Sequence, residues 1–376
     1  MLSCPRMKVC IDIQSAIAQR AGVGRYTKML VEHLGSLRGT DEISLFYFDF
    51  KRQGIPFHVS GVSQRAVRWV PGRFVQKAWK TIGWPPFDAF SGPADVFHFP
   101  NFIRPPLARG KSVVTIHDVA FLRYPETIEA ANYRYLTSQI RQTVDRADAI
   151  ITVSQFTADE VAELLGVPAQ KLFPITSGLD QSFQRPGQDA LTLMRRELDI
   201  ERPYLLTVGT LEPRKNIGFL LDVFEKLDGF DGDLVIAGMR GWKYEPLLER
   251  MRNSPKAARI KYVEYVDEQL LPALYAGASL FVLPSLYEGF GFTPLEAMQN
   301  ETPVISSAAG SLPEVLGNNT AVIVKEPTVD AWTSAIQSLL TDTARRQACI
   351  RQGLRHVRQF TWAETALKTW DVYRRI

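Results

Sequence analysis

The sequence predicts an α/β protein built from two doubly wound, Rossmann-like domains. The first half of the chain alternates short apolar runs with amphipathic segments, and a second series of the same kind begins after a loop around residues 178–189. Buried strands that alternate with helices are typical of a parallel sheet with helices on both faces. The length of 376 residues is sufficient for two such domains, which we place at residues 1–185 and 186–359.

Each element is predicted from its hydrophobic pattern. The expected strands are Val9–Ile13, Ile43–Phe48, Val96–Phe99, Ser112–Ile116, Ala149–Val153, Tyr204–Val208, Leu234–Ala237, Leu280–Leu283, Val304–Ser306 and Ala321–Val324. The expected helices are Tyr26–Leu37, Tyr133–Ala147, Phe156–Leu165 with Ser154 as its N-cap, Ile217–Leu227, Glu268–Ala276, Pro294–Gln299 and Val329–Leu340. Because open α/β sheets bind ligands beyond the carboxyl ends of their strands, the loops that follow strands are the candidate sites.

The loop after the strand Leu280–Leu283 carries the most distinctive motif, Y-E-G-F-G-F-T-P-L-E-A-M. It holds Glu288 and Glu296 in an E-x7-E arrangement around two glycines, and Thr293-Pro294 predicts the start of a helix. The free amides of a helix N-terminus and the helix dipole favour an anion such as a diphosphate. The alternative is a capping box made by Thr293 and Glu296, which needs no ligand but leaves Glu288 unexplained.

A second motif, V-G-T-L-E-P-R-K-N, follows the strand Tyr204–Val208. Gly209 allows a ligand to approach the backbone closely. Arg214 and Lys215 lie at the expected N-terminus of the next helix, where cations oppose the helix dipole unless an anion is bound. A diphosphate would remove this conflict, and a solvated Arg-Lys pair is the alternative.

Two further loops of the first half follow strands. T-I-H-D-V places His117 and Asp118 at a strand end, where the imidazole could bond a sugar hydroxyl or a leaving phosphate and the carboxylate could orient it. A structural histidine beside a turn aspartate is the alternative. A-G-V-G-R-Y contains Gly22 and Gly24 but lacks the third glycine of a dinucleotide fingerprint, so we expect a tight loop whose amides approach a donor or acceptor.

Composition and charge exclude several classes of protein. Hydrophobic residues make up 45% and charged residues 22%, and no run approaches the roughly 18 apolar residues of a membrane span. The N-terminus lacks the apolar core of a secretory signal. Three scattered cysteines form neither a disulfide framework nor a zinc site, which favours a reducing compartment. We expect a cytoplasmic protein, and the net charge of +4 does not indicate a nucleic-acid partner.

The segment 51–87 has no acidic residue and mixes lysines and arginines with aromatic side chains. Such a mixture suits an anionic membrane surface. We therefore expect peripheral contact with the cytoplasmic face of the inner membrane through residues 65–84. A solvated basic helix over core aromatics is the alternative.

Taken in order, D-I-Q-S, A-G-V-G-R-Y, H-D-V, G-T-L-E-P-R-K-N and the E-x7-E segment resemble the retaining glycosyltransferases of family 4, in a mannosyltransferase-like branch. The resemblance covers nearly the whole chain, and E-x7-E is its most specific part. It implies the GT-B architecture, in which two Rossmann-like domains face across a cleft and a C-terminal helix, here within 360–376, crosses back to the first domain.

The resemblance also implies roles for residues. Arg214 and Lys215 would hold the donor diphosphate, Glu296 the ribose hydroxyls, and Glu288 the donor sugar or the charge developing at its anomeric carbon. His117 would lie near the transferred sugar.

Backbone groups complete the implied donor site. Amides of Phe290, Gly291, Phe292 and Thr293 would cradle sugar and phosphate, and Val266 would present its backbone to the base. Glu264 stands where the family usually has glycine.

The function implied is transfer of a hexose, with mannose from GDP-mannose as our choice, to a hydroxyl of a glycan or lipid-linked oligosaccharide in surface polysaccharide or lipopolysaccharide synthesis. No metal or other cofactor is expected, since GT-B enzymes generally need none, and we interpret the D-x-D spacing at Asp231 and Asp233 as a turn. The alternatives are a UDP-sugar donor, a GT-B-like sugar-nucleotide epimerase, and a catalytically silent binding module.

Overall fold

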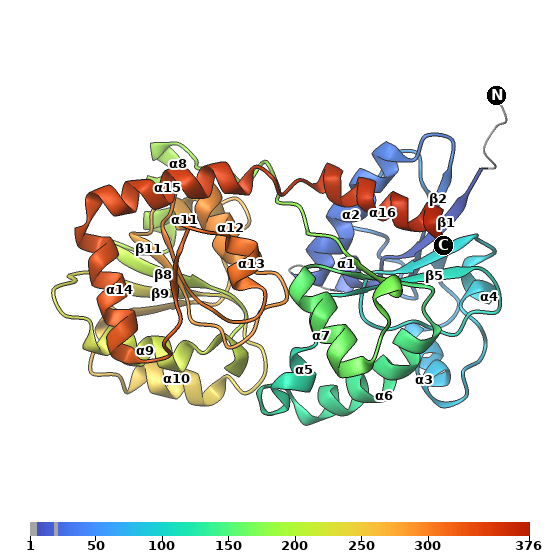
Figure 1. Cartoon of the computed structure of the whole chain (residues 1–376), viewed down its shortest axis with the longest axis horizontal. Coiled ribbons are helices and arrows are strands. Elements are labelled where there is room, and N and C mark those ends of the chain that lie inside the picture. The colour runs from blue at the N-terminus through green and yellow to red at the C-terminus, as the bar shows by residue number, and fades with distance from the viewer. Residues whose placement is uncertain (1–5, 19–21) are drawn as a thin grey trace. The chain divides into compact units, whose positions relative to one another are not determined.

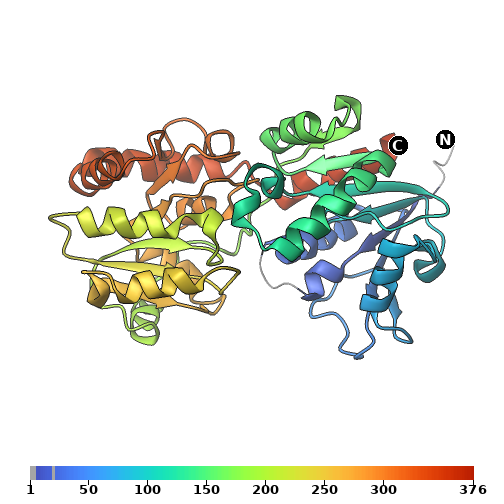
Figure 2. The ribbon, with the colours of Figure 1, turned by 90° about the horizontal axis from the view of Figure 1, so that it is seen from below.

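The computed structural model describes residues 6–18 and 22–376 and divides the chain into two compact units. One unit comprises residues 1–119, 134–178 and 361–376, and the other comprises residues 120–133 and 179–360. Each unit contains its own parallel β-sheet flanked by helices, which confirms the predicted fold class (Figures 1 and 2).

The sheet of the first unit has the order β3-β2-β1-β4-β5-β6-β7. Its strands are β1 (Lys8–Asp12), β2 (Glu42–Phe48), β3 (Ser63–Val67), β4 (Val96–Phe99), β5 (Lys111–Ile116), β6 (Ala149–Thr152) and β7 (Leu172–Pro174). Its helices are α1 (Gln14–Ala18), α2 (Val23–Leu37), α3 (Gly72–Thr81), α4 (Asp88–Ser91), α6 (Ala130–Arg146), α7 (Gln155–Leu165) and α16 (Trp362–Arg375), with a 3₁₀ turn at Ala169–Lys171. The strand order reverses between β1 and β4, which marks the point where doubly wound sheets bind ligands.

The sheet of the second unit has the order β10-β9-β8-β11-β12-β13 and reverses between β8 and β11. Its strands are β8 (Tyr204–Val208), β9 (Asp233–Ala237), β10 (Ile260–Val263), β11 (Leu280–Leu283), β12 (Val304–Ser307) and β13 (Val322–Val324). Its helices are α5 (Ala120–Arg123), α8 (Gln188–Glu197), α9 (Ile217–Lys226), α10 (Glu245–Arg252), α11 (Leu271–Ala276), α12 (Phe292–Gln299), α13 (Leu312–Leu316), α14 (Val329–Thr341) and α15 (Thr343–Val357), with 3₁₀ turns at Pro125–Thr127, Pro213–Lys215 and Ala257–Arg259.

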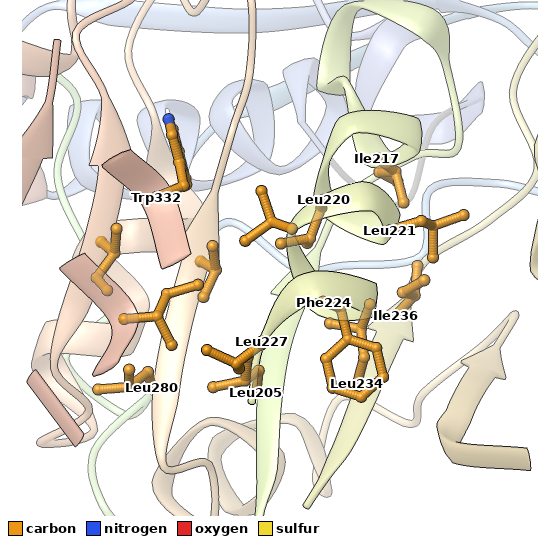
Figure 3. Close-up of a cluster of buried hydrophobic side chains, with 14 of the residues drawn as sticks. Leu205, Ile217, Leu220, Leu221, Phe224, Leu227, Leu234, Ile236, Leu280 and Trp332 are labelled. Atoms are coloured by element: carbon orange, nitrogen blue, oxygen red, sulfur yellow. The ribbon is translucent and has the colours of Figure 1, made fainter. Parts of the chain in front are cut away.

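The core of the second unit fixes the loops that follow β8 and β9. Helix α9 turns Leu220, Leu221 and Phe224 onto the sheet, where they meet Leu205 of β8 and Ile236 of β9 (Figure 3). These side chains are buried, and each contributes on the order of 1.5–3 kcal/mol of transfer free energy. The helix start, and with it the preceding loop, is therefore held firmly against the sheet.

The C-terminal helix α16 belongs to the first unit, as predicted. Its Trp370 indole donates to the Leu34 carbonyl at 3.3 Å, and the Tyr373 hydroxyl lies 2.6 Å from His98 Nδ1. Thr361 caps the helix by accepting from the Glu364 amide. Buried aromatic side chains thus tie the end of the chain to the sheet of the first unit.

The basic and aromatic segment divides into a buried and an exposed part. Phe87 is fully buried and its ring centroid lies 4.4 Å from that of Phe46, so it belongs to the core. Trp69, Phe74 and Trp84 are instead 73%, 56% and 65% exposed. No helix among the described residues has both the length and the apolar character needed to cross a membrane.

Candidate active site

The loops after β8 and β11 bring the predicted cations and the first glutamate of E-x7-E together. Lys215 Nζ lies 2.6 Å from Glu288 Oε1, and Arg214 Nη1 lies 3.1 Å from Glu288 Oε2. Arg214 Nη1 also donates to the Tyr287 carbonyl at 2.7 Å. Since these two strands flank the point where the strand order reverses, the cluster occupies the ligand-binding edge of the sheet.

Electrostatics keep Glu288 ionised. Burial alone would raise the pKa of this carboxyl, but Lys215, Arg214 and the hydroxyl of Ser285 outweigh it and hold the pKa at about 2. A carboxylate with two cations beside it resists protonation at any physiological pH.

Arg214 and Lys215 do not lie in the first turn of α9, where the sequence predicts them. Both residues lie in the 3₁₀ turn Pro213–Lys215, and Asn216, with φ 54°, separates this turn from α9. The cations are compensated by carboxylates: Glu288 contacts both, and Glu212 Oε1 lies 2.5 Å from Arg214 Nη2. A bound diphosphate would therefore share the two cations with these acids.

Sequence reasoning missed several residues of this cluster. Glu212 stands inside the G-T-L-E-P-R-K-N motif. Ser285, two residues beyond the end of β11, donates through its Oγ to Glu288 Oε1 at 2.7 Å. Ser311, from the loop after β12, donates through its amide and its hydroxyl to the Glu288 carbonyl at 2.9 and 3.0 Å. The position of Glu212 and Ser285 after strands was the signal that could have found them.

Two glycines permit the close approach of these loops. A Cβ at Gly310 would lie 2.3 Å from the Glu288 carbonyl oxygen, so no side chain fits there. A Cβ at Gly209 would lie 3.4 Å from Lys215 Cε, because the lysine side chain folds back over this residue. Lys215 thus occupies the space beside Gly209, where the sequence predicts that a ligand approaches the backbone.

Helix α12 begins earlier than the sequence predicts. Its N-cap is Gly291, with φ 94°, and makes no side-chain capping bond, so Thr293 and Pro294 lie inside the first turn. The capping-box interpretation is therefore wrong. The amides of Phe292 and Thr293 belong to the first turn, where amides have no partner within the helix.

Glu296 lies on α12 and is 3% exposed. Its Oε2 accepts from the Tyr275 hydroxyl of α11 at 2.9 Å. The neighbouring Phe290 is buried too, with its ring centroid 4.9 Å from that of Phe292. The two glutamates of E-x7-E thus have different partners: Glu288 contacts cations, and Glu296 contacts a phenol.

The loop after β10 holds the residues predicted to face a base. Val266 is half-buried, and Glu264 Oε2 lies 2.8 Å from Arg240 Nη2. Arg240 also lies 5.6 Å from the ring centroid of Tyr244. The departure from the family's usual glycine therefore adds an oriented carboxylate to this strand end.

In the first unit, His117 follows β5 and is half-buried. Its Nε2 lies 2.8 Å from the Pro100 carbonyl, which can only accept, so this nitrogen carries the proton. The ring meets Tyr26 edge-on, with centroids 4.8 Å apart. Burial lowers the pKa of His117, although the Pro100 carbonyl and Asp118 oppose the shift, so the imidazole is held mainly neutral.

Of the A-G-V-G-R-Y loop, Ala21 lies outside the described residues. Gly22, with φ 58°, is the N-cap of α2, and a Cβ there would meet nothing within 4 Å. Gly24 is buried in the first turn of the helix. Because φ at this position is positive, glycine is favoured at the start of α2.

The D-x-D spacing lies away from this edge. Asp231 precedes β9 at the opposite end of the strand, and Asp233 is its first residue. Both acids lie near Arg259, at 3.7 and 4.0 Å. In the part of the chain that the structure describes, no group of three or more His, Cys, Asp or Glu side chains could hold a metal ion.

Comparison with known families finds a match in each half of the chain. Residues 20–183 match the family model "Glycosyltransferase Family 4", and residues 193–356 match "Glycosyl transferases group 1". The boundary between the two matches falls near the boundary between the two units.

Curated proteins and solved structures resemble most of the chain. It is 29% identical to O-antigen chain mannosyltransferase B of Escherichia coli, over 98% of this chain and 100% of that protein. It is 28% identical to the serotype-specific mannosyltransferase WbdA of the same organism, over 71% of this chain but 34% of WbdA. In fold it resembles sucrose-phosphate synthase from Thermosynechococcus elongatus (TM-score 0.77, 21% identity, 98% and 99% of the two chains) and the lipopolysaccharide glycosyltransferase WaaG (TM-score 0.73, 16%, 97% and 99%).

Proposed function

Because the chain belongs to glycosyltransferase family 4 and is a hexosyltransferase of the GT-B fold, we propose that it transfers mannose from GDP-mannose to a hydroxyl of a lipid-linked glycan. The observation that carries this proposal is the cluster of Arg214, Lys215 and Glu288 beside the start of α12. The match to a mannosyltransferase over 98% of this chain supports the choice of sugar and a place in surface polysaccharide synthesis.

The cluster fits departure of a nucleoside diphosphate. The bond between the anomeric carbon and the diphosphate oxygen breaks, and the electron pair stays on the oxygen. Arg214, Lys215 and the first amides of α12 stabilise that negative charge, which is the largest catalytic contribution such a site can make. Glu288, held ionised, stabilises the positive charge at the anomeric carbon.

The acceptor hydroxyl then forms the new bond on the face that the diphosphate left, so the configuration is retained. Its proton passes to the leaving diphosphate oxygen, and the nucleoside diphosphate is released. In the first unit, His117 is held mainly neutral with its Nε2 proton on the Pro100 carbonyl, and it is our candidate for bonding a hydroxyl of the transferred sugar. No step requires a metal or another cofactor.

The carboxylate of Glu264 favours guanine as the base. Guanine presents two N–H donors side by side, which one carboxylate can accept together, whereas uracil presents a single N–H. Arg240 holds the Glu264 carboxylate at 2.8 Å and so orients it. An oriented carboxylate beside the residue expected to face the base is consistent with a GDP-sugar.

A thermal-shift panel of GDP, UDP and ADP tests the choice of base. A nucleotide that binds the folded state raises the melting temperature by mass action, and we expect GDP to give the largest rise. Product analysis with GDP-mannose, with and without a glycan acceptor, tests the reaction. An isomerised sugar nucleotide formed from donor alone would show an epimerase, and binding without turnover would show a silent module.

The exposed part of the basic and aromatic segment is suited to peripheral contact with an anionic membrane. On and beside α3, Phe74, Ile82 and Trp84 expose 56%, 70% and 65% of their area, and Arg73 and Lys77 lie on the same short helix. Apolar and basic side chains together are the mark of a helix that lies on lipid. Such contact would place the enzyme at the cytoplasmic face of the inner membrane.

Vesicle co-sedimentation tests this contact. Wild-type protein should sediment with anionic vesicles and much less with neutral ones, and Arg73→Ala/Lys77→Ala should lose the difference. Arg68 is unsuitable for the test because it pairs with Asp49 at 3.2 Å. Equal binding to both vesicle types, unchanged in the double variant, would refute the contact.

A further inference from the structure

The first unit contains a cavity of about 250 Å³ at the carboxyl edge of its sheet. Asp12 and Gln14, which end and follow β1, line one side, and residues 99–103, which end and follow β4, line another. Residues of helices α1, α3 and α6 complete the lining. Because the strand order reverses between β1 and β4, the cavity occupies the position where doubly wound sheets bind ligands.

The lining offers the groups that bind a sugar. Trp79, Phe102 and Tyr135 present aromatic rings, and Gln76 and Asn101 present amides. The Trp79 indole N–H donates to the Pro85 carbonyl at 2.6 Å, so the ring is held in place. Aromatic faces pack against the C–H face of a sugar ring, and amides bond its hydroxyls.

Three cations line the same cavity, against one carboxylate, that of Asp12. Arg104 bonds the Ser112 hydroxyl at 2.9 Å, whereas Lys80 Nζ lies 3.5 Å from the centroid of the Tyr135 ring. Within residues 6–18 and 22–376, the structure records no carboxylate paired with Lys80 or Arg146. Like charges that share a cavity favour an anionic ligand, and phosphate is the anion that lysine and arginine bind best.

The cavity shares a wall with the residue expected near the transferred sugar. The Pro100 carbonyl holds His117, and the Phe102 ring centroid lies 5.8 Å from that of His117. Both Pro100 and Phe102 line the cavity. Phe102 has φ 53°, a conformation that costs on the order of 1–3 kcal/mol for a non-glycine residue and persists where the surroundings hold it. A ligand in this cavity would lie beside His117.

We propose that this cavity binds the glycosyl phosphate head of a lipid-linked acceptor, with the sugar on Trp79 and Tyr135 and the phosphate on Lys80 and Arg146. Helix α3, which lines the cavity with Gln76, Trp79 and Lys80, also carries the exposed side chain of Phe74. One short helix thus serves both the polar head and the apolar tail of such an acceptor. The inference rests on the proposed function and identifies its acceptor by chemistry.

Calorimetry with soluble sugar phosphates tests the proposal. The α-1-phosphates of mannose, glucose and N-acetylglucosamine are titrated in saturating GDP, which occupies the donor phosphate site, and methyl glycosides of the same sugars and inorganic phosphate are compared. We expect one sugar phosphate to bind more tightly than its methyl glycoside and than phosphate alone. Lys80→Ala/Arg146→Ala should weaken it about tenfold.

Arg141→Ala is the matched control, because Arg141 is exposed on the same helix as Arg146 but does not line the cavity. This variant should bind the sugar phosphate as wild type does. Equal binding of wild type and the double variant would overturn the proposal, as would inorganic phosphate binding as tightly as every sugar phosphate. If GDP, UDP or ADP still raises the melting temperature, that failure concerns the cavity alone. If none of the three nucleotides does, the donor site is refuted instead.

Discussion

Replacing Glu288 by glutamine should destabilise the protein and yet increase its stabilisation by a nucleoside diphosphate. The pKa of Glu288 is lowered from 4.5 to about 2, and at 1.36 kcal/mol for each pKa unit this corresponds to about 3 kcal/mol of stability at neutral pH. Removing one partner of a buried ion pair costs about 3–5 kcal/mol, which agrees. Glutamine keeps the shape of the side chain but leaves Lys215 and Arg214 without this charge.

Urea unfolding as a function of pH measures the effect. The folded pKa lies below the unfolded one, so the contribution of Glu288 is complete above pH 4.5 and is lost as the pH falls towards about 2. The difference between wild type and Glu288→Gln should therefore be about 3 kcal/mol at pH 7 and should shrink on acidification. GDP should raise the melting temperature of the variant more than that of wild type, because the diphosphate supplies the missing negative charge.

Two results would refute this reasoning. If Glu288→Gln unfolds at the same urea concentration as wild type at pH 7, the two ion pairs contribute nothing. If GDP stabilises the variant less than wild type, the diphosphate is not bound by the cations that Glu288 contacts. Activity is measured in parallel. If Glu288 acts on the donor sugar, the variant should lose turnover whatever GDP does to its melting temperature.

Further predictions concern Lys215, Asp12 and Glu264. Lys215→Ala should lower kcat by about 10²–10³-fold while the folded structure is retained, and near-normal turnover would refute its role at the leaving group. Burial raises the pKa of Asp12 from 3.8 to about 6, so ionised Asp12 destabilises the folded state as the pH rises through that window. Urea unfolding of Asp12→Asn should therefore show a gain in the free energy of unfolding of up to about 3 kcal/mol at pH 7 and none below pH 3.8. An equal effect at both pH values would contradict this cause. Glu264→Ala should reduce the preference for GDP over UDP about tenfold in the thermal-shift panel, and an unchanged preference would exclude Glu264 from base recognition.

The fold was predictable wherever burial produces a continuous apolar run. β4, β8 and β11 lie where the sequence predicts them, because central parallel strands are buried on both faces. The strands β3, β7 and β10 were missed, and all three are sheet edges. β3, with the sequence Ser-Gln-Arg-Ala-Val, is mostly exposed and therefore lacks the signal.

That Arg214, Lys215 and Glu288 lie together was predictable from the sequence, but their individual contacts were not. Position after a strand identified Arg214, Lys215 and Glu288, since topology alone brings the ends of β8 and β11 together. The partner of Glu296 was not predictable, because Tyr275 lies on another helix 21 residues away. The start predicted for α12 was wrong. Gly291 adopts the left-handed conformation and begins the helix without a side-chain cap.

The cavity beside His117 could not be predicted. Its walls come from the ends of β1 and β4 and from helices α1, α3 and α6. Lys80 and Arg146 belong to amphipathic helices, and in the sequence such charged side chains indicate a face exposed to solvent. Only the packing of α3 and α6 at the sheet edge turns these charges towards one space.

The most direct test is a crystal structure with GDP bound. We expect diphosphate oxygens within hydrogen-bonding distance of Arg214, Lys215 and the first amides of α12. A diphosphate bound elsewhere, with Glu288 still contacting both cations and no phosphate near them, would contradict it.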